Sequence, residues 1–258
     1  MKTTRRTLFT ASAAGLAAAA LPHEAFAAGP TVDEQFTSWP AGSAWNANRT
    51  VRINGDWTGT GGNQLLRSNV RIAHGVATMT SRANQLSGAE LQTAPDKLLG
   101  NGYYEASMQM SSVPGILSGI FFKAENYGMP EVDIEIRSRD NGAGKEHYAF
   151  YTVHYFGGGH QYKQVRLPFD PAAGFHSYGF LMGRNSIRFY VDGKLTHTWT
   201  NLPTNLGAPA EPKGYLMTNS WAQPGEWVGA LPTQDTATRI NWLRHWAGAT
   251  APRFTPAR

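Results

Sequence analysis

Short runs that alternate between hydrophobic and polar residues fill most of the chain after its first 27 positions. Alternation with a period of two is typical of β-strands with one buried face. Turn-forming residues separate these runs about every 8–15 positions, among them Asn54-Gly55, His74-Gly75, Asn101-Gly102, Asn141-Gly142 and Pro224-Gly225. We find no long stretch with a helical period and no repeat, so the pattern predicts one all-β domain, a sandwich or a barrel.

The clearest local prediction is a β-hairpin over residues 187–199. Two alternating runs, 187–191 and 194–199, flank the pair Asp192-Gly193. Aspartate followed by glycine is typical of a two-residue type I′ turn, because both of its central positions need a positive φ.

Composition excludes several kinds of chemistry. The chain has 258 residues, of which only 16% are charged, and it contains no cysteine. The lack of cysteine excludes disulfides, cysteine-ligated metals and thiol nucleophiles. The formal net charge is +5. Because no run of five or more basic residues occurs, nucleic acid is not an expected partner.

The first 27 residues have the features of an export signal. Arg5 and Arg6 precede an apolar stretch at 8–21, and a small-residue cleavage site ends at Ala27. The stretch is shorter than the roughly 20 residues that span a bilayer. The paired arginines favour the twin-arginine type over an ordinary secretory signal. The sequence thus predicts a signal at 1–27, one domain at 28–258, and a periplasmic or secreted protein without membrane contact after cleavage.

The run 131–136 alternates strictly between acidic and aliphatic residues. On a strand, Glu131, Asp133 and Glu135 project from one face and the aliphatic residues from the other. One interpretation is a solvated acidic face. It is disfavoured because like charges two residues apart lie only about 7 Å from each other and because strands disfavour Asp and Glu. A metal site is a second interpretation, but the chain has no looped cluster like that of an EF-hand.

The spacing favours a third interpretation, a pair of catalytic carboxylates. The Cα atoms of Glu131 and Glu135 lie about 13 Å apart on a regular strand, so side chains that converge on a concave face bring their carboxyls to within roughly 5 Å. A retaining glycosidase needs about 5–5.5 Å between its two carboxyls. Asp133 lies between them and is placed to give the two groups different protonation states.

Several segments, in one order, resemble glycoside hydrolase family 16. The acidic run is similar to the family's E-[IV]-D-[IVF]-E motif in its uninterrupted form. The other similar segments are Gly102-Tyr103-Tyr104-Glu105, 115–122, Phe175-His176-Ser177-Tyr178, 187–193 and Asn219-Ser220-Trp221. The resemblance is strongest to bacterial lichenases, which are endo-β-1,3-1,4-glucanases, and to glycanases that act on bacterial exopolysaccharides.

This resemblance implies a β-jelly-roll sandwich of the concanavalin A type, with a substrate cleft across its concave face. It implies that Glu131 is the nucleophile and that Glu135 is the general acid and then the base. It also implies that Asp133 assists by hydrogen-bonding Glu131. No cofactor is expected.

Substrate contacts are expected from Glu90, Phe121, Asn219, Trp221, Tyr127 and Trp227. The first four follow from the family motifs, and the last two are aromatic residues expected near the cleft. Flat rings suit sugar faces, although burial in the core is the alternative for each of them. Tyr103 is a further aromatic candidate, and His154 is the one histidine expected near the sugar. The other tryptophans receive no functional assignment from the sequence.

Four positions depart from the lichenase pattern. Met129 replaces a tryptophan, Gln92 an arginine and Lys123 a tyrosine. Asn241 stands where the family often has an aspartate that binds a structural calcium, which argues against that ion here. The catalytic residues therefore match the pattern, and the sugar contacts match it only in part.

These features predict a retaining endo-β-glycanase that hydrolyses a β-glucan, with mixed-linkage β-1,3-1,4-glucan as the preferred substrate. One alternative is a glycanase or transglycosylase that acts on a bacterial exopolysaccharide or another β-linked polymer. A second is a carbohydrate-binding jelly roll without catalysis. The expected partner is a polysaccharide, and the protein is expected to be a monomer.

Overall fold

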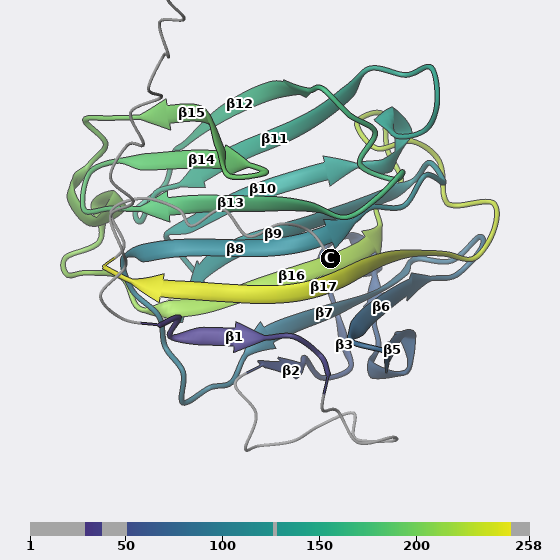
Figure 1. Ribbon diagram of the computed structural model, residues 1–258, viewed down its shortest axis with the longest axis horizontal. Helices are drawn as coiled ribbons and strands as arrows, with labels where there is room; N and C mark the ends of the chain where they lie inside the picture. The colour runs from purple at the N-terminus through teal and green to yellow at the C-terminus, as the bar shows by residue number, and fades with distance from the viewer. Residues whose placement is uncertain (1–28, 38–50, 126–127, 249–258) are drawn as a thin grey trace, which may run out of the picture.

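The computed structural model describes residues 29–37, 51–125 and 128–248. Within these ranges, β-strands form two sheets that pack face to face (Figure 1). The connections include the 3₁₀ helices η1 (Thr60–Gly62), η2 (Arg67–Asn69), η3 (Ser138–Asp140) and η4 (Thr204–Gly207). No helix in the described part of the chain has the length and hydropathy needed to cross a bilayer.

The eight-stranded sheet lies on one side of the sandwich. In spatial order its strands are β15 (Lys194–Trp199), β14 (Ile187–Val191), β13 (His176–Met182), β8 (Gly102–Gln109), β17 (Thr236–Ala247), β6 (Val76–Ser81) and β5 (Val70–Ala73), with β1 (Val32–Glu34) paired to β17. All of its pairs are antiparallel. The expected hairpin is confirmed, since Asp192 and Gly193 between β14 and β15 both have a positive φ, 48° and 70°.

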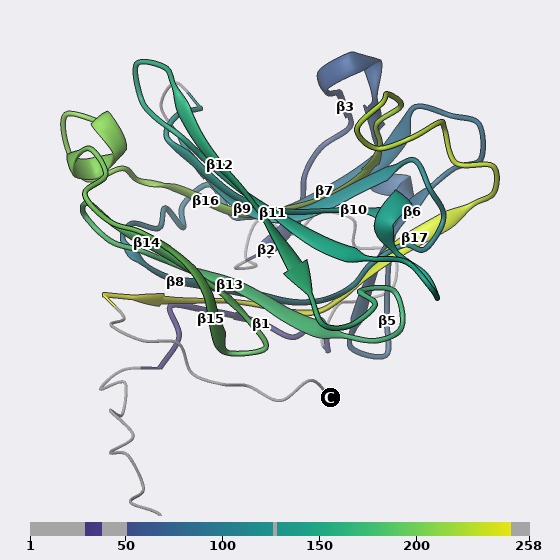
Figure 2. The same cartoon turned by 90° about the horizontal axis from the view of Figure 1, so that it is seen from above.

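The nine-stranded sheet forms the other layer. In spatial order its strands are β12 (His160–Leu167), β11 (His147–His154), β10 (Glu131–Arg137), β9 (Ile116–Ala124), β16 (Gly214–Ala222), β7 (Ser87–Thr93), β4 (Gln64–Leu65) and β3 (Trp57–Thr58), with β2 (Val51–Ile53) paired to β7. Figure 2 shows that this sheet bends away from its partner toward both ends, where β12 and β3 rise. The face turned away from the core is therefore concave.

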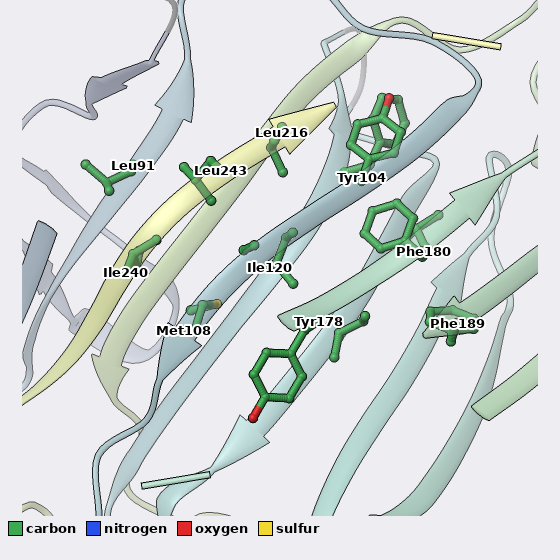
Figure 3. Packing of buried hydrophobic residues seen from close by; sticks show 14 of the residues in the cluster. Leu91, Tyr104, Met108, Ile120, Tyr178, Phe180, Phe189, Leu216, Ile240 and Leu243 are labelled. Carbon is green, nitrogen blue, oxygen red and sulfur yellow. The ribbon is translucent and has the colours of Figure 1, made fainter. Parts of the chain in front are cut away.

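The core fills the space between the two sheets. It forms because alternate residues of each strand point inward, for example Tyr104 and Met108 on β8 and Ile120 on β9 (Figure 3). The ring of Tyr104 stacks on that of Phe180, with ring centroids 4.9 Å apart. This layer holds the nine-stranded sheet in place, so its concave face is a rigid platform for side chains. The fold is the all-β jelly-roll sandwich that the sequence predicts.

Candidate active site

The acidic run forms β10, which lies well inside the nine-stranded sheet between β9 and β11. Val132, Ile134 and Ile136 are at most 1% exposed and belong to the core. The three acidic side chains therefore project onto the concave face, as the alternation predicts.

A glycine on the neighbouring strand makes room for the last of these acids. Gly119 on β9 is the cross-strand partner of Glu135. A Cβ atom at this position would lie 2.7 Å from the carbonyl oxygen of Ile134 and 3.6 Å from Cγ of Glu135. Because glycine has no Cβ, β9 approaches β10 closely beside the Glu135 side chain.

Two adjoining hollows on the concave face form a groove beside β10. The smaller, about 90 Å³, is lined by the three acidic residues together with Gly119, Ile120, Phe121, Ile134, Asn219 and Trp221. The larger, about 270 Å³, extends toward β3 and is lined by Asn54, Trp57, Thr60, Leu65, Glu90, Phe121, Lys123, Glu131, Met217, Asn219 and Trp221. Four residues line both hollows, so they form one continuous groove that begins at the carboxyls.

Glu131 lies between two basic side chains on the neighbouring strands. Its cross-strand partner on β9 is Lys123 and its partner on β11 is His154. The ammonium of Lys123 forms an ion pair with the Glu131 carboxylate. The Nε2 atom of His154 lies 3.7 Å from Oδ2 of Asp133. Burial lowers the pKa of His154 and opposes its protonation.

The other two acids of β10 are held toward their protonated forms. Burial raises the pKa of Asp133 well above its usual value, and the charges of Glu131 and Glu135 raise it further, as does a hydrogen bond with Glu131. Burial, aided by the charge of Glu131, raises the pKa of Glu135 to about 7. The site thus combines an ion-paired carboxylate with a carboxylic acid that keeps its proton up to about neutral pH.

Glu90 on β7 carries a further buried carboxyl in the larger hollow. Nδ2 of Asn54 donates a hydrogen bond of 2.5 Å to its Oε1. Burial raises the pKa of Glu90 to about 7, and hydrogen bonds with Asn54 and Asn219 oppose that rise. The cluster of carboxyl and amide groups has the chemistry that recognises sugar hydroxyls, since the amides both donate and accept and the carboxyl oxygens accept hydrogen bonds.

A group of aromatic side chains lies on the opposite side of β10, beside Glu135. Phe150 on β11 is the cross-strand partner of Glu135. Tyr162 on β12 stacks on Phe150 with ring centroids 6.0 Å apart, and Trp227 meets Phe150 edge-on at 5.4 Å. The guanidinium of Arg137 lies 4.5 Å above Phe150. The Tyr162 side chain is exposed (49%), so its ring offers a flat surface to a ligand.

The structure brings most of the predicted site residues together. Glu90, Phe121, Asn219 and Trp221 line the groove with the three acids of β10, and Trp227 lies in the aromatic group next to it. Tyr127 lies outside the described residues.

The expectation that Tyr103 lies near the cleft is wrong. Tyr103 lies on β8 in the eight-stranded sheet, fully buried beside Trp246 and Tyr190. Its hydroxyl donates to Glu105. The sequence alone could not exclude it, because alternation does not say which sheet a strand joins.

Sequence reasoning missed several residues of the site. Trp57 is 42% exposed and lines the larger hollow, but it lies on a strand of two residues that carries no pattern. Asn54 falls in a connection between strands, and its hydrogen bond to Glu90 and its place in the lining of the larger hollow mark it only in the folded chain. Tyr162 belongs to β12, which pairs with β11 through a register that the sequence does not specify.

One group of side chains has the geometry to hold a metal ion. Ligand atoms of Glu131, Asp133 and His154 lie within 4.8 Å of one another. Asn241, where the calcium site was considered, lies on β17 at an irregularity in its pairing with β8. Among the described residues, no group of three acidic or histidine side chains gathers around it. The residues present there do not fit a calcium site built on carboxylates.

Comparison with known proteins shows the family of this chain. The model of the glycosyl hydrolases family 16 matches residues 54–244. The chain belongs to glycosyl hydrolase family 16. The family's acidic motif lies on β10. The groove beside it lies on the concave face, where the resemblance implies a substrate cleft.

Relatives in the family include bacterial and plant proteins. The beta-glucanase of Bacillus subtilis is 38% identical over 153 residues, which cover 57% of this chain and 58% of that protein. Xyloglucan endotransglucosylase protein 8 of Diospyros kaki is 30% identical and covers 69% of this chain and 64% of its own length. The chain thus spans less than two thirds of the length of these relatives. Among solved structures, the beta-glucanase of Bacillus licheniformis superposes with a TM-score of 0.68 at 25% identity, over 84% of this chain and 98% of that one.

Proposed function

We propose that the protein is a retaining endo-β-glucanase, with mixed-linkage β-1,3-1,4-glucan as its preferred substrate. The observation that carries the proposal is the presence on β10 of an ion-paired carboxylate, Glu131, and a half-buried carboxylic acid with a raised pKa, Glu135, both lining one groove. Family membership and the beta-glucanase relatives support it. No cofactor has a part in this chemistry.

The reaction would proceed by double displacement. The Glu131 carboxylate attacks the anomeric carbon while Glu135 gives its proton to the glycosidic oxygen, so the bond to the leaving sugar breaks and a glycosyl-enzyme forms. Glu135, now ionised, takes a proton from water, and the resulting hydroxide equivalent attacks the anomeric carbon and releases Glu131. Both carboxyl groups thereby return to their starting protonation states, and the configuration at the anomeric carbon is retained.

Asp133 would act through Glu131. Burial and the charges of Glu131 and Glu135 raise the pKa of Asp133, which favours the protonated form that can donate a hydrogen bond to Glu131. This bond orients the attacking oxygen and adds no second negative charge next to it. The sugar on the other side would be held by Phe121, Trp221 and the polar pair Glu90 and Asn219, which line the groove.

The substrate is tested with a panel of polysaccharides. The purified protein is incubated with lichenan, laminarin, carboxymethylcellulose, xyloglucan, agarose and a succinoglycan-type polymer, and products are identified by size and by NMR. Short β-configured oligosaccharides from lichenan are expected. Cleavage of another polymer alone would contradict the preferred substrate, and binding without any cleavage would contradict the enzymatic proposal.

The two roles are separated by azide rescue on an activated aryl β-glycoside. In Glu131→Ala, azide takes the place of the nucleophile and should yield an α-glycosyl azide. In Glu135→Ala, Glu131 still forms the glycosyl-enzyme from the activated leaving group, and azide should then yield a β-glycosyl azide. Exchanged anomers would show that the two assignments are reversed.

A transglycosylase is the second candidate. The exposed ring of Tyr162 beside Glu135 favours it, because an aromatic platform on that side would hold an acceptor sugar. One relative is named a xyloglucan endotransglucosylase. The same catalytic residues serve both reactions. Product analysis with a labelled acceptor oligosaccharide distinguishes them, since a transglycosylase transfers label into longer chains at the expense of hydrolysis.

We also propose that residues 1–27 direct export and that 28–258 act as the single catalytic domain. Arg5 and Arg6 support a twin-arginine signal. The signal lies outside the described residues. Replacement of both arginines by lysine should retain the unprocessed chain in the cytoplasm of a bacterial host, which an N-terminal mass measurement of each fraction would test.

A further inference from the structure

Three side chains that can ligate a metal meet on the neighbouring strands β10 and β11. Glu131 and Asp133 lie two residues apart on the same face of β10, and His154 on β11 is the cross-strand partner of Glu131. One ligand atom from each of the three lies within 4.8 Å of the other two. Among the residues that the structure describes, they form the one group of three histidine or acidic side chains with this spacing.

Asp133 has a buried oxygen atom that lacks a partner. The side chain is only 9% exposed. It shares a hydrogen bond with Glu131, yet its Oδ2 atom has no hydrogen-bond partner within the described part of the chain. Nε2 of His154 lies 3.7 Å from this oxygen, which is too far for a hydrogen bond. A buried polar atom without a partner costs free energy, and buried charges in proteins are paired or coordinate metals.

The separation of these two atoms fits two ligands of one ion. Zinc binds imidazole nitrogen and carboxylate oxygen at about 2.0–2.2 Å, so neighbouring ligand atoms around a tetrahedral zinc ion lie roughly 3.4 Å apart. The 3.7 Å between His154 and Asp133 is close to that value. His176 and Asp192 provide the contrast, because they lie 2.8 Å apart and hydrogen-bond directly.

The kinds of ligand atom select the class of ion. Calcium and magnesium prefer oxygen ligands alone. An imidazole nitrogen together with carboxylates suits zinc and other divalent transition metals. Val132, between the two acids, is fully buried in the core, so β10 holds both acids in place before any ion binds.

Lys123 opposes an ion at this place. Its ammonium pairs with Oε2 of Glu131 and already supplies a positive charge there. A cation that binds Glu131 therefore displaces the ammonium or takes the other oxygen of the carboxylate. The Lys123 side chain is 40% exposed, so its ammonium can turn into solvent. A divalent ion brings twice the charge and, unlike the ammonium, also provides a partner for Asp133 and His154.

We propose that Glu131, Asp133 and His154 form a binding site for Zn²⁺ or a similar divalent transition-metal ion, and that the bound ion inhibits the enzyme. The ion would hold the nucleophile Glu131 and its neighbour Asp133, so that neither acts on a sugar. Binding follows from the three side chains alone, whereas inhibition rests on the proposed function.

The first test measures binding without any turnover. Zn²⁺ is titrated into the untagged protein at pH 7 in a calorimeter, and binding is expected for Zn²⁺ but not for Mg²⁺. His154→Gln and Asp133→Asn should each weaken Zn²⁺ binding at least about tenfold, since even the outer neighbours of metal ligands contribute about 10- to 100-fold. Two substitutions are used so that a folding defect in one leaves the other informative. An unsubstituted protein that binds no Zn²⁺, or variants that bind it equally well, would overturn the proposal.

His160 provides the matched control for His154. It lies on β12 opposite His154, with ring centroids 5.7 Å apart, and it does not belong to the group of three. His160→Gln should bind Zn²⁺ as the unsubstituted protein does. Equal losses in His160→Gln and His154→Gln would mean that a pair of histidines holds the ion, which contradicts the proposed site.

Lys123→Met tests whether Glu131 is a ligand. The substitution removes the charge that competes for Glu131, so Zn²⁺ binding should tighten about two- to fivefold, as expected for the loss of a partly exposed ion pair. Unchanged or weaker binding in this variant would remove Glu131 from the site and contradict the proposal.

The last test measures inhibition with barley β-glucan as the substrate. At low substrate concentration, the Zn²⁺ concentration that halves activity should match the dissociation constant, and EDTA should restore the activity. His154→Gln should be at least about tenfold less sensitive to Zn²⁺. Zn²⁺ binding without any loss of activity would overturn the inhibition. A protein that binds Zn²⁺ through these residues but cleaves no polysaccharide would support the binding site and contradict the proposed function.

Discussion

Glu135 on β10 and Glu105 on β8 are two glutamates, one in each sheet, and burial raises the pKa of both to about 7. Their surroundings differ. Glu105 is fully buried, and hydrogen bonds with Tyr103 and Ser177 and the charge of Arg244 oppose the rise of its pKa. Glu135 lines the groove, and its charged neighbour Glu131 adds to the rise. A raised pKa therefore marks burial. Only an open groove and a second carboxyl make such a group a candidate acid catalyst.

The largest expected effect is the difference in activity between variants of the two glutamates. Glu135→Gln removes the proton donor, so kcat on barley β-glucan should fall at least about 1,000-fold. Glu105→Gln should leave kcat within about threefold, because Glu105 is buried in the eight-stranded sheet and does not line the groove. Steady-state kinetics on both variants provide the measurement. Comparable losses in the two variants would mean that Glu135 has no special role.

The pH profile should separate the two glutamates next. Glu135 acts in its protonated form, so kcat/KM should fall about tenfold per pH unit above about pH 7 and about 100-fold by pH 9. The Glu105→Gln variant should show the same basic limb, although Glu105 has a similar pKa. If the limb moves in that variant, the fall in activity reports loss of structure instead of the acid catalyst.

The pH dependence of stability should change when Glu105 is replaced, although the pH profile of activity does not. The pKa of Glu105 is raised in the folded state from 4.5 to about 7, so the folded protein binds more protons and its stability declines as the pH rises through this window. Glu105→Gln removes that decline. Its free energy of unfolding relative to the unsubstituted protein should be higher at pH 8 than at pH 5 by roughly 1–3 kcal/mol. Urea unfolding at the two pH values measures this difference, and the contributions of the other buried acids cancel in it.

The smallest expected effects concern the tyrosine near each glutamate. Tyr162 is exposed beside Glu135, so Tyr162→Ala should lower kcat/KM about three- to tenfold through lost sugar stacking, with little change in stability. Tyr103 is buried and donates to Glu105, so Tyr103→Phe should cost roughly 1 kcal/mol of stability without a change in kcat/KM. Activity assays paired with thermal unfolding distinguish the two effects. A loss of activity in Tyr103→Phe would contradict a purely structural role for the eight-stranded sheet.

Part of the site was predictable because its signal is local. Strict alternation at 131–136 placed the three acids on one face, and the aliphatic residues between them entered the core as expected. The hairpin at 187–199 followed from two strands and the turn pair Asp192-Gly193. The family motifs added Glu90, Phe121, Asn219 and Trp221, and all four line the groove.

The rest of the site depends on contacts between segments far apart in sequence. Tyr103 and Tyr162 look alike as aromatic residues of strands, yet one is buried in the eight-stranded sheet and the other is exposed beside Glu135. The order of strands decides between them, and alternation carries no information about that order. Trp57 and Asn54 reach the groove from connections and short strands for the same reason.

The sequence by itself determined the all-β class, the face on which the acids of β10 lie and the carboxylate chemistry, because strand period and residue type are properties of the chain within a few positions. Only the tertiary structure decided which acid pairs with a lysine and which acids have a raised pKa. Burial and the charges of neighbouring strands set that balance, and the neighbour that pairs with Glu131, Lys123, comes from β9 through a register that only the folded sheet defines.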